Sequence, residues 1–290
     1  MNNPDPPSGP AASGPLTRRV GSDLILRVGS SLVLIPVALG AAWWGGWPAY
    51  LLVGVVAVLF FLEWALVVGS SDALFTGDPR VLAPAAFVAA SVIITGQISP
   101  FSGIILTLLA GVVGASIGRS PWLGGGAFYA ALFGVALTAI RRDPVDGLSA
   151  IVVLLVAVWA ADSCAYFAGR LIGGPKLWPR VSPKKTWSGA IGGLVGGVGF
   201  ALLAAFLLGV PPSFGLVVLL VVLVLVSQAG DLAESALKRR FGRKDSSSII
   251  PGHGGVLDRV DGLAAAGVVA FLVGWAHQGA EAIGGGILSW

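Results

Sequence analysis

The stretch from Ser235 to Asp261 combines positive charge, carboxylates and a glycine turn, and it lies between two very hydrophobic segments. Its first half is strongly basic, and the cations are Lys238, Arg239, Arg240, Arg243 and Lys244. Its second half contains Pro251-Gly252-His253-Gly254-Gly255, followed by Asp258 and Asp261. Cations neutralise phosphate oxygens, carboxylates hold divalent metal ions, and a glycine backbone can approach a ligand closely. The stretch therefore predicts a site that binds phosphate groups together with a metal ion.

A second group of polar residues ends the hydrophobic segment before this stretch. If the helix continues into the basic run, Asp231, Ser235 and Lys238 share one face, because they are spaced i, i+4 and i+7. The alternative is a helix end with snorkelling charges, which accounts for the cations but not for Asp231. A carboxylate at membrane depth is costly and usually functional. We therefore take Asp231, Ser235 and Lys238 as candidate catalytic residues.

Asp258 and Asp261 are three residues apart, so they share a face on the first turn of the next helix. They could simply complement the positive end of the helix dipole. They could also join Asp231 in holding Mg²⁺, which prefers carboxylates and substrate phosphates. In the second reading all three aspartates are catalytic metal ligands, and the backbone of His253-Gly254-Gly255 presents N–H groups to phosphate.

A third group lies in residues 161–193. Asp162 stands near the end of a hydrophobic helix, and Lys184 and Lys185 follow the fixed turn of Ser182-Pro183. The lysines could be interface anchors on the basic side of the membrane. The turn favours the alternative, in which Ser182, Lys184 and Lys185 belong to a positioned loop that closes the site.

Glu63 is a carboxylate within the hydrophobic segment LLVGVVAVLFFLEWALVV. A buried carboxylate needs a partner or a neutral form. Glu63 could pair with a lysine or arginine of the site, or it could lock two helices together. The sequence leaves both possibilities open.

The composition indicates an integral membrane protein. The chain is 56% hydrophobic and 11% charged, whereas a soluble domain has about 25% charged residues. Nine hydrophobic segments predict an all-α, polytopic bundle of about nine transmembrane helices. The segments are 26–44, 48–69, 81–96, 101–118, 124–140, 148–168, 188–209, 213–231 and 262–284.

The expected organisation is a disordered tail (1–20), N-terminal transmembrane helices (21–145) and a C-terminal transmembrane catalytic region (146–290). With nine spans, one side of the membrane receives 16 of the 18 basic residues. The positive-inside rule places that side in the cytoplasm. The loops 169–187 and 232–261 then lie together on the cytoplasmic face, with the active site between them, and we expect a bacterial inner membrane.

The same residues resemble the signature of the phosphatidate cytidylyltransferase (CDP-diacylglycerol synthase) family. The resemblance runs without a gap from Ser235-Ala-Leu-Lys238-Arg239 through Ile250-Pro251-Gly252-His253-Gly254-Gly255 to Asp258-Arg259-Val260-Asp261. Asp162, Ser182-Pro183-Lys184-Lys185-Thr186, Gly189 and Gly230-Asp231 are similar to further family blocks. Many members have Glu where this chain has Ser188, so that carboxylate is missing here.

The resemblance implies an enzyme that joins CTP to phosphatidic acid and releases CDP-diacylglycerol and pyrophosphate. It also implies a need for Mg²⁺, a second cation (K⁺) and a homodimer among the membrane lipids; no nucleic acid is expected as a partner. Lys238, Arg239, Lys244 and Arg259 would neutralise the triphosphate or the lipid phosphate, and Ser235 would bond a phosphate or a metal-bound water.

Two other function classes remain open at this stage. One is a transferase or kinase that uses CTP but acts on another lipid, since the signature does not show which lipid is bound. The other is a transporter of a phosphorylated anion, which the lack of a convincing internal repeat disfavours.

Overall fold

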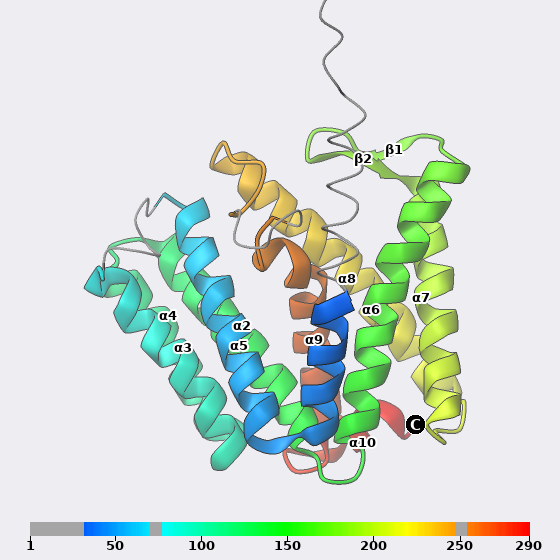
Figure 1. The fold of residues 1–290 in the computed structure, drawn as a ribbon, viewed down its shortest axis with the longest axis horizontal. Helices are drawn as coiled ribbons and strands as arrows, with labels where there is room; N and C mark the ends of the chain where they lie inside the picture. Colours follow the sequence, from blue (N-terminus) through cyan, green and yellow to red (C-terminus); the bar gives the residue numbers. More distant parts are fainter. Residues whose placement is uncertain (1–31, 70–76, 248–253) are drawn as a thin grey trace, which may run out of the picture.

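The computed structural model describes residues 32–69, 77–247 and 254–290. The tail expected over residues 1–20 and His253 lie outside these ranges. The described chain is almost entirely helical (Figure 1). A helix over Leu32–Trp44 comes first. It is followed by α2 (Gly46–Val67), α3 (Pro79–Gln97), α4 (Pro100–Ile117), α5 (Pro121–Arg142), α6 (Gly147–Leu171), α7 (Trp187–Leu207), α8 (Phe214–Arg240), α9 (Leu257–Gln278) and α10 (Ile283–Leu288).

The helices α2 to α9 are each long and hydrophobic enough to cross a membrane. Helices satisfy all their backbone hydrogen bonds internally, which is the condition for crossing a bilayer. Local signals fix where they begin. Pro79 and Pro100 stand at the first helical positions, where no N–H is needed, and the side chains of Asp78 and Ser99 accept hydrogen bonds from the first turn. The predicted polytopic helical bundle is confirmed.

Three helix ends differ from the sequence prediction. Helix α8 continues to Arg240, well beyond residue 231, so the shared face of Asp231, Ser235 and Lys238 exists. Helix α6 continues to Leu171, which places Asp162 deeper within it than expected. The last segment breaks at Gly279, whose φ of 84° ends α9, and the chain then forms the separate short helix α10.

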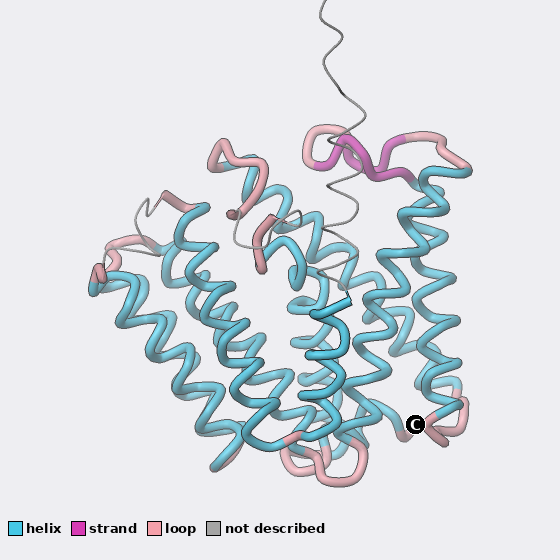
Figure 2. Tube along the Cα trace, in the orientation of Figure 1, coloured by secondary structure: helices cyan, strands magenta, loops and turns pink. Residues whose placement is uncertain are grey.

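The part of the 169–187 region expected to be a loop forms a small antiparallel hairpin. Strand β1 (Lys176–Trp178) pairs with β2 (Ser182–Thr186). Figure 2 shows these strands beyond the helix ends, and Figure 1 places them at the same end of the bundle as the C-terminal end of α8 and the start of α9. The two polar regions predicted to share a face do so. Helix α10 lies at the opposite end.

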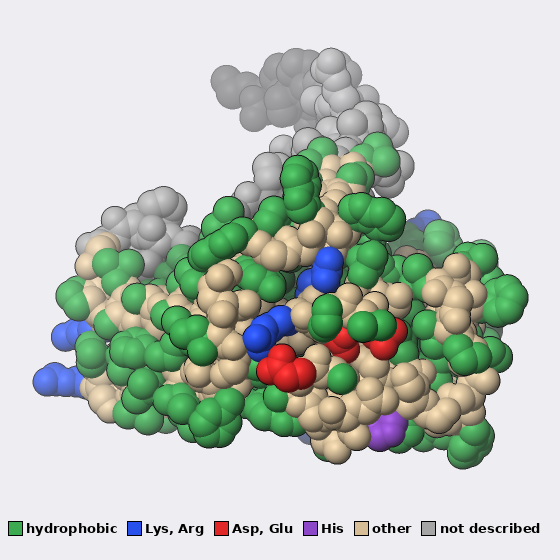
Figure 3. All heavy atoms as spheres, turned by 90° about the horizontal axis from the view of Figure 1, so that it is seen from below, with side chains coloured by type: hydrophobic (Ala, Val, Ile, Leu, Met, Phe, Trp, Pro, Cys, Tyr) green, Lys and Arg blue, Asp and Glu red, His purple; other side chains and the backbone are tan. Residues whose placement is uncertain are grey.

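The end that carries α10 exposes mainly hydrophobic and uncharged atoms, with a small group of charged side chains near its middle (Figure 3). Large hydrophobic side chains are also exposed on the outer helix faces, as Trp44, Phe206 and Phe214 show. In a bilayer these side chains contact lipid instead of water. The molecule is therefore an integral, multi-pass membrane protein.

Helix α7 packs closely along α6 through glycines. A Cβ atom on Gly189, Gly193 or Gly197 would lie 2.8–2.9 Å from a backbone carbonyl oxygen of α6. Such close approach between membrane helices requires small residues. The hairpin joins these two helices, so the packing of α6 against α7 fixes where the hairpin begins and ends.

Candidate active site

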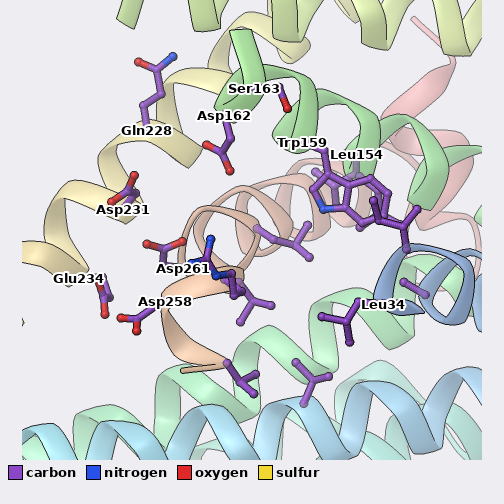
Figure 4. Close-up of a pocket in the computed structure, with 18 of the residues that line it drawn as sticks. Leu34, Leu154, Trp159, Asp162, Ser163, Gln228, Asp231, Glu234, Asp258 and Asp261 are labelled. Carbon is purple, nitrogen blue, oxygen red and sulfur yellow. The ribbon is translucent and has the colours of Figure 1, made fainter. Parts of the chain in front are cut away.

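One cavity of about 1240 Å³ is lined by residues of the helix Leu32–Trp44, α2, α5, α6, α8, α9 and the hairpin. One part is hydrophobic and includes Leu34, Val53, Leu154 and Trp159. The other part is charged, and the side chains there include Asp162, Lys184, Lys185, Asp231, Glu234, Lys238, Asp258, Arg259 and Asp261. Figure 4 labels the five acidic ones. Arg141 and Arg170 line the cavity as well. A molecule with a charged head and a hydrophobic tail matches both parts.

Three carboxylates reach the charged part from three different helices. Asp162 comes from α6, Asp231 from α8 and Asp261 from α9, and Figure 4 shows all three bordering the same space. Asp162 and Glu234 were not selected from the sequence as site residues. The signal was present for both, since each is an acidic residue next to long hydrophobic runs, where a charge is expensive.

Lys238 is held between two carboxylates at the α8–α9 contact. Its Nζ lies 2.6 Å from Glu234 Oε2, one turn earlier on α8, and 2.6 Å from Asp258 Oδ1 on α9. Asp258 Oδ2 also accepts hydrogen bonds from the backbone N–H groups of Gly255, at 3.0 Å, and Ser246, at 3.3 Å. The contact with Gly255 supports the interpretation that Asp258 stabilises the N-terminal end of α9. The contact with Lys238, which lines the cavity, connects the same carboxylate to the site.

The hairpin reaches the site through an ion pair between Lys185 on β2 and Asp231 on α8. Ser235 Oγ lies 3.5 Å from Asp231 Oδ1, as the helical spacing predicted. Arg239 Nε lies 3.5 Å from the carbonyl oxygen of Val181, at the edge of the same hairpin. The two polar regions are therefore joined by direct contacts.

The remaining predicted residues divide into two groups. Lys184, Lys185 and Arg259 line the cavity, whereas Ser182, Ser235, Arg239, Lys244, Gly254 and Gly255 lie outside its described lining. Gly255 gives its N–H to Asp258, so this group is not presented to a phosphate in this structure. His253 lies outside the described residues. The substrate-binding roles of these residues stay predictions.

A metal ion was predicted on Asp231, Asp258 and Asp261. Among the described residues, no three acidic, histidine or cysteine side chains are close enough together to hold one ion. Asp258 is engaged by Lys238, whereas Asp231 and Asp261 border the same part of the cavity. Mg²⁺ commonly uses one or two carboxylates and completes its shell with substrate phosphates and water. The residues present fit such a site, and the metal assignment remains a prediction.

Glu63 joins α2 to the start of α9, which is the second of the two alternatives that the sequence left open. It is fully buried in α2 and accepts four hydrogen bonds from residues in the described ranges. Oε1 accepts from Ser247 Oγ at 2.8 Å and from the backbone N–H of Val256 at 2.9 Å. Oε2 accepts from Ser246 Oγ at 2.8 Å and from the backbone N–H of Leu257 at 2.8 Å. Within the described chain none of these partners is a cationic side chain. They are two serine hydroxyls that precede α9 and the backbone N–H groups at its start, so Glu63 locks α2 to the N-terminal end of α9.

Known proteins are similar to this chain in sequence, two of the three described here over most of its length. A protein of Brucella suis biovar 1 named phosphatidate cytidylyltransferase is 42% identical over 262 residues, covering 87% of this chain and 94% of the relative. A protein of the same name from Pseudomonas aeruginosa is 37% identical over 269 residues, covering 86% of this chain and 96% of the relative. One from Bacillus subtilis is 45% identical over 123 residues, covering 42% of this chain and 46% of the relative.

Residues 25–277 match the sequence model described as the cytidylyltransferase family. This match includes every helix that lines the cavity and both polar regions that supply its charged side chains. Architecture, cavity and sequence agree, and the chain belongs to the cytidylyltransferase family.

Proposed function

We propose that this protein transfers CMP from CTP to phosphatidic acid and produces CDP-diacylglycerol and pyrophosphate. Family membership and relatives named phosphatidate cytidylyltransferase support the reaction. The structural observation that carries the proposal is the cavity itself, which has a charged part and a hydrophobic part in one continuous space. Phosphatidic acid has the same two parts.

The cavity suggests how the substrates are arranged. The acyl chains of phosphatidic acid lie along Leu34, Val53 and Leu154, and its phosphate lies at the charged end. Lys184 and Arg259 supply positive charge there, which phosphate groups require. CTP enters from the polar end of the bundle, because its triphosphate and sugar are too polar for the membrane core.

In the reaction, an oxygen of the lipid phosphate forms a bond to the α-phosphorus of CTP. The bond from that phosphorus to the oxygen bridging the α- and β-phosphates breaks, and pyrophosphate leaves with the electron pair. Such transfers need little covalent chemistry from the protein, which positions the groups and stabilises charge. Lys238 is already fixed by two carboxylates, so its charge needs no reorganisation during the reaction.

Magnesium is proposed as the cofactor, with K⁺ as a second cation. When bound, Mg²⁺ would neutralise the charge that develops on the phosphate oxygens. Asp231 and Asp261 are the carboxylates that face the space where the phosphates would lie, and Asp258 is the third predicted ligand. Ser235, next to Asp231, would bond a phosphate or a water molecule.

The proposed location is a bacterial inner membrane with the active site in the cytoplasm. Within the described ranges, Arg141 and Arg142 lie at the α10 end, and the other basic residues lie toward the hairpin end. Excess Lys and Arg mark the cytoplasmic side. A homodimer is also proposed, on the resemblance described above.

The reaction is tested with purified protein, Mg²⁺ and phosphatidic acid in mixed micelles. CTP is labelled either at the α- or at the γ-phosphate. Cytidylyl transfer puts the α-label, and not the γ-label, into the lipid. A lipid labelled from the γ-position would instead indicate a kinase. If neither label reaches phosphatidic acid, the proposal fails; other lipid phosphates as acceptors, and counterflow of labelled solute in proteoliposomes, then test the remaining alternatives.

A further inference from the structure

Glu63 and Asp258 share the donors of one short region of the chain. Ser246 donates its hydroxyl to Glu63 and its backbone N–H to Asp258. On the other side, Gly255 donates its N–H to Asp258, and the next two residues, Val256 and Leu257, donate theirs to Glu63. Any displacement of Glu63 therefore moves groups that hold Asp258.

The residues around the Glu63 carboxylate are packed so closely that a larger side chain at Gly255 does not fit. A Cβ atom on Gly255 would lie 1.9 Å from Ser246 Oγ and 2.2 Å from Glu63 Oε2. Only glycine can pass between the hydroxyl and the carboxylate at this point. The four donors match an ionised carboxylate, because this group accepts hydrogen bonds and donates none. Two of the donors are the backbone N–H groups of Val256 and Leu257 at the start of α9, where N–H groups lack partners within the helix.

Glu63 itself does not belong to the described lining of the cavity. Its influence on the cavity runs through Asp258, whose other oxygen lies 2.6 Å from Lys238 Nζ. The contacts form a chain from α2 through Ser246 and the first turn of α9 to Asp258, and then to Lys238 on α8. Each step of this chain is a hydrogen bond or an ion pair between described residues.

We infer that Glu63 is a positioning residue for the transfer reaction, acting by fixing Asp258 and, through it, Lys238. The inference rests on the proposed function. A purely structural role predicts that loss of Glu63 lowers stability without a specific effect on turnover. A positioning role predicts a fall in kcat with substrate affinity largely preserved, because Lys184, which lines the cavity from strand β2, is not one of the residues that make these contacts.

The test variant is Glu63→Gln, which keeps the size of the side chain but replaces one acceptor oxygen with an NH₂ group. A serine hydroxyl can rotate to accept from this group, but the backbone N–H of Val256 or Leu257 cannot. We expect kcat to fall at least tenfold, which corresponds to about 1.4 kcal/mol in the barrier. The KM for CTP should change by less than about threefold.

Asp143→Asn is the matched control. Asp143 is also buried, at 4% exposure, and accepts hydrogen bonds from the backbone N–H groups of Val145, Asp146 and Gly285. It fastens the α5–α6 connection to α10 at the opposite end of the bundle. The control should lose thermal stability and keep kcat within about twofold of the wild type.

Hydrogen exchange gives a readout that does not depend on activity. The amides of residues 254–258 should exchange faster in Glu63→Gln and at the wild-type rate in Asp143→Asn. If Glu63→Gln does not fold, Ser246→Ala removes a single donor and should show the same effects at smaller amplitude, about threefold in kcat.

Three results would overturn the inference. They are a folded Glu63→Gln variant with nearly wild-type kcat, an equal loss of kcat in Asp143→Asn, and unchanged exchange at residues 254–258. If the wild type forms no CMP-lipid, the proposed function fails instead. The exchange comparison then still decides whether Glu63 anchors the start of α9.

Discussion

The ammonium group of Lys238 on α8 lies 2.6 Å from the carboxylate of Asp258 on α9. The side chains of both residues are only 12% exposed, so water screens this contact poorly. Glu234 approaches the same ammonium group to 2.6 Å. One cation thus balances two acidic side chains where the two helices meet beside the cavity.

Replacing Lys238 with methionine should lower both stability and turnover. The change leaves Glu234 and Asp258 without their cation, and breaking a buried pair from one side costs about 3–5 kcal/mol. We expect a clear fall in the melting temperature in detergent and at least about a hundredfold loss of kcat. Lys176→Met, on the exposed strand β1, is the control and should change neither. Normal turnover in folded Lys238→Met would show that this charge has no part in the reaction.

Asp261→Asn should separate a metal role from a structural one. The Asp261 carboxylate lines the cavity, and it accepts a local hydrogen bond from the N–H of Gly262, at 2.7 Å. We therefore expect little change in stability, turnover at least about a hundredfold lower, and residual activity that needs more Mg²⁺. The measurement is kcat over a Mg²⁺ titration. Nearly wild-type turnover at ordinary Mg²⁺ would contradict the assignment of Asp261 as a ligand.

Asp258→Asn should behave differently, because Asp258 holds Lys238 and two backbone N–H groups. We expect turnover to fall by at least about a hundredfold and the melting temperature to fall with it. A helix-dipole role alone would cost about 0.3–1 kcal/mol of stability and leave turnover intact. A Mg²⁺ requirement that also rises in this variant would support Asp258 as a metal ligand.

Ser188→Ala should be tolerated, although many members of the family carry a glutamate there. The Ser188 hydroxyl donates to the carbonyl oxygen of Gly173 and lies 3.0 Å from Thr186 Oγ1, and Ser188 is outside the cavity lining. Losing this contact costs about 1 kcal/mol of stability. The variant should keep at least roughly a tenth of wild-type activity. A thousandfold loss in a folded variant would reveal a catalytic role for the hydroxyl.

The orientation in the membrane can be tested with single cysteines after replacing the native Cys164. Lys176→Cys, on the hairpin, should react with a membrane-impermeant thiol reagent only in inside-out vesicles. Val145→Cys, which is 81% exposed at the opposite end, should react only from the outside of cells with a permeabilised outer membrane. Labelling of position 176 from outside such cells would reverse the proposed topology.

Much of this architecture follows from the sequence, because a bilayer imposes simple rules. A long hydrophobic run that crosses a bilayer must be a helix. An acidic residue beside such a run is costly and usually functional, and this rule identified Asp231. The strands of the hairpin were not predicted. They are short, KLW and SPKKT, and show no clear alternation of hydrophobic and polar residues over a useful length.

The partners of Glu63 could not be predicted either. They lie 183–194 positions along the chain, and two of them are backbone N–H groups, which carry no sequence signal. The ion pair between Lys185 and Asp231 depends on the hairpin folding back over α8, which is a tertiary event. Sequence identified the chemical groups of the site, while their pairing depends on how the helices pack.

The hydrophobic part of the cavity has a consequence for how the enzyme meets its lipid. Leu34 and Val37 line the cavity and are 47% and 48% exposed, on a helix at the hydrophobic surface of the bundle. The solvent of an acyl chain is the hydrophobic interior of the bilayer, so the chain can enter this part of the cavity from the membrane without crossing water. The enzyme and phosphatidic acid then meet by lateral diffusion in the membrane. The rate at which they meet depends on the number of phosphatidic acid molecules per unit of membrane area. Diluting phosphatidic acid with inert lipid at constant bulk concentration should therefore slow the reaction, whereas diluting the whole suspension should not change the turnover of each enzyme molecule.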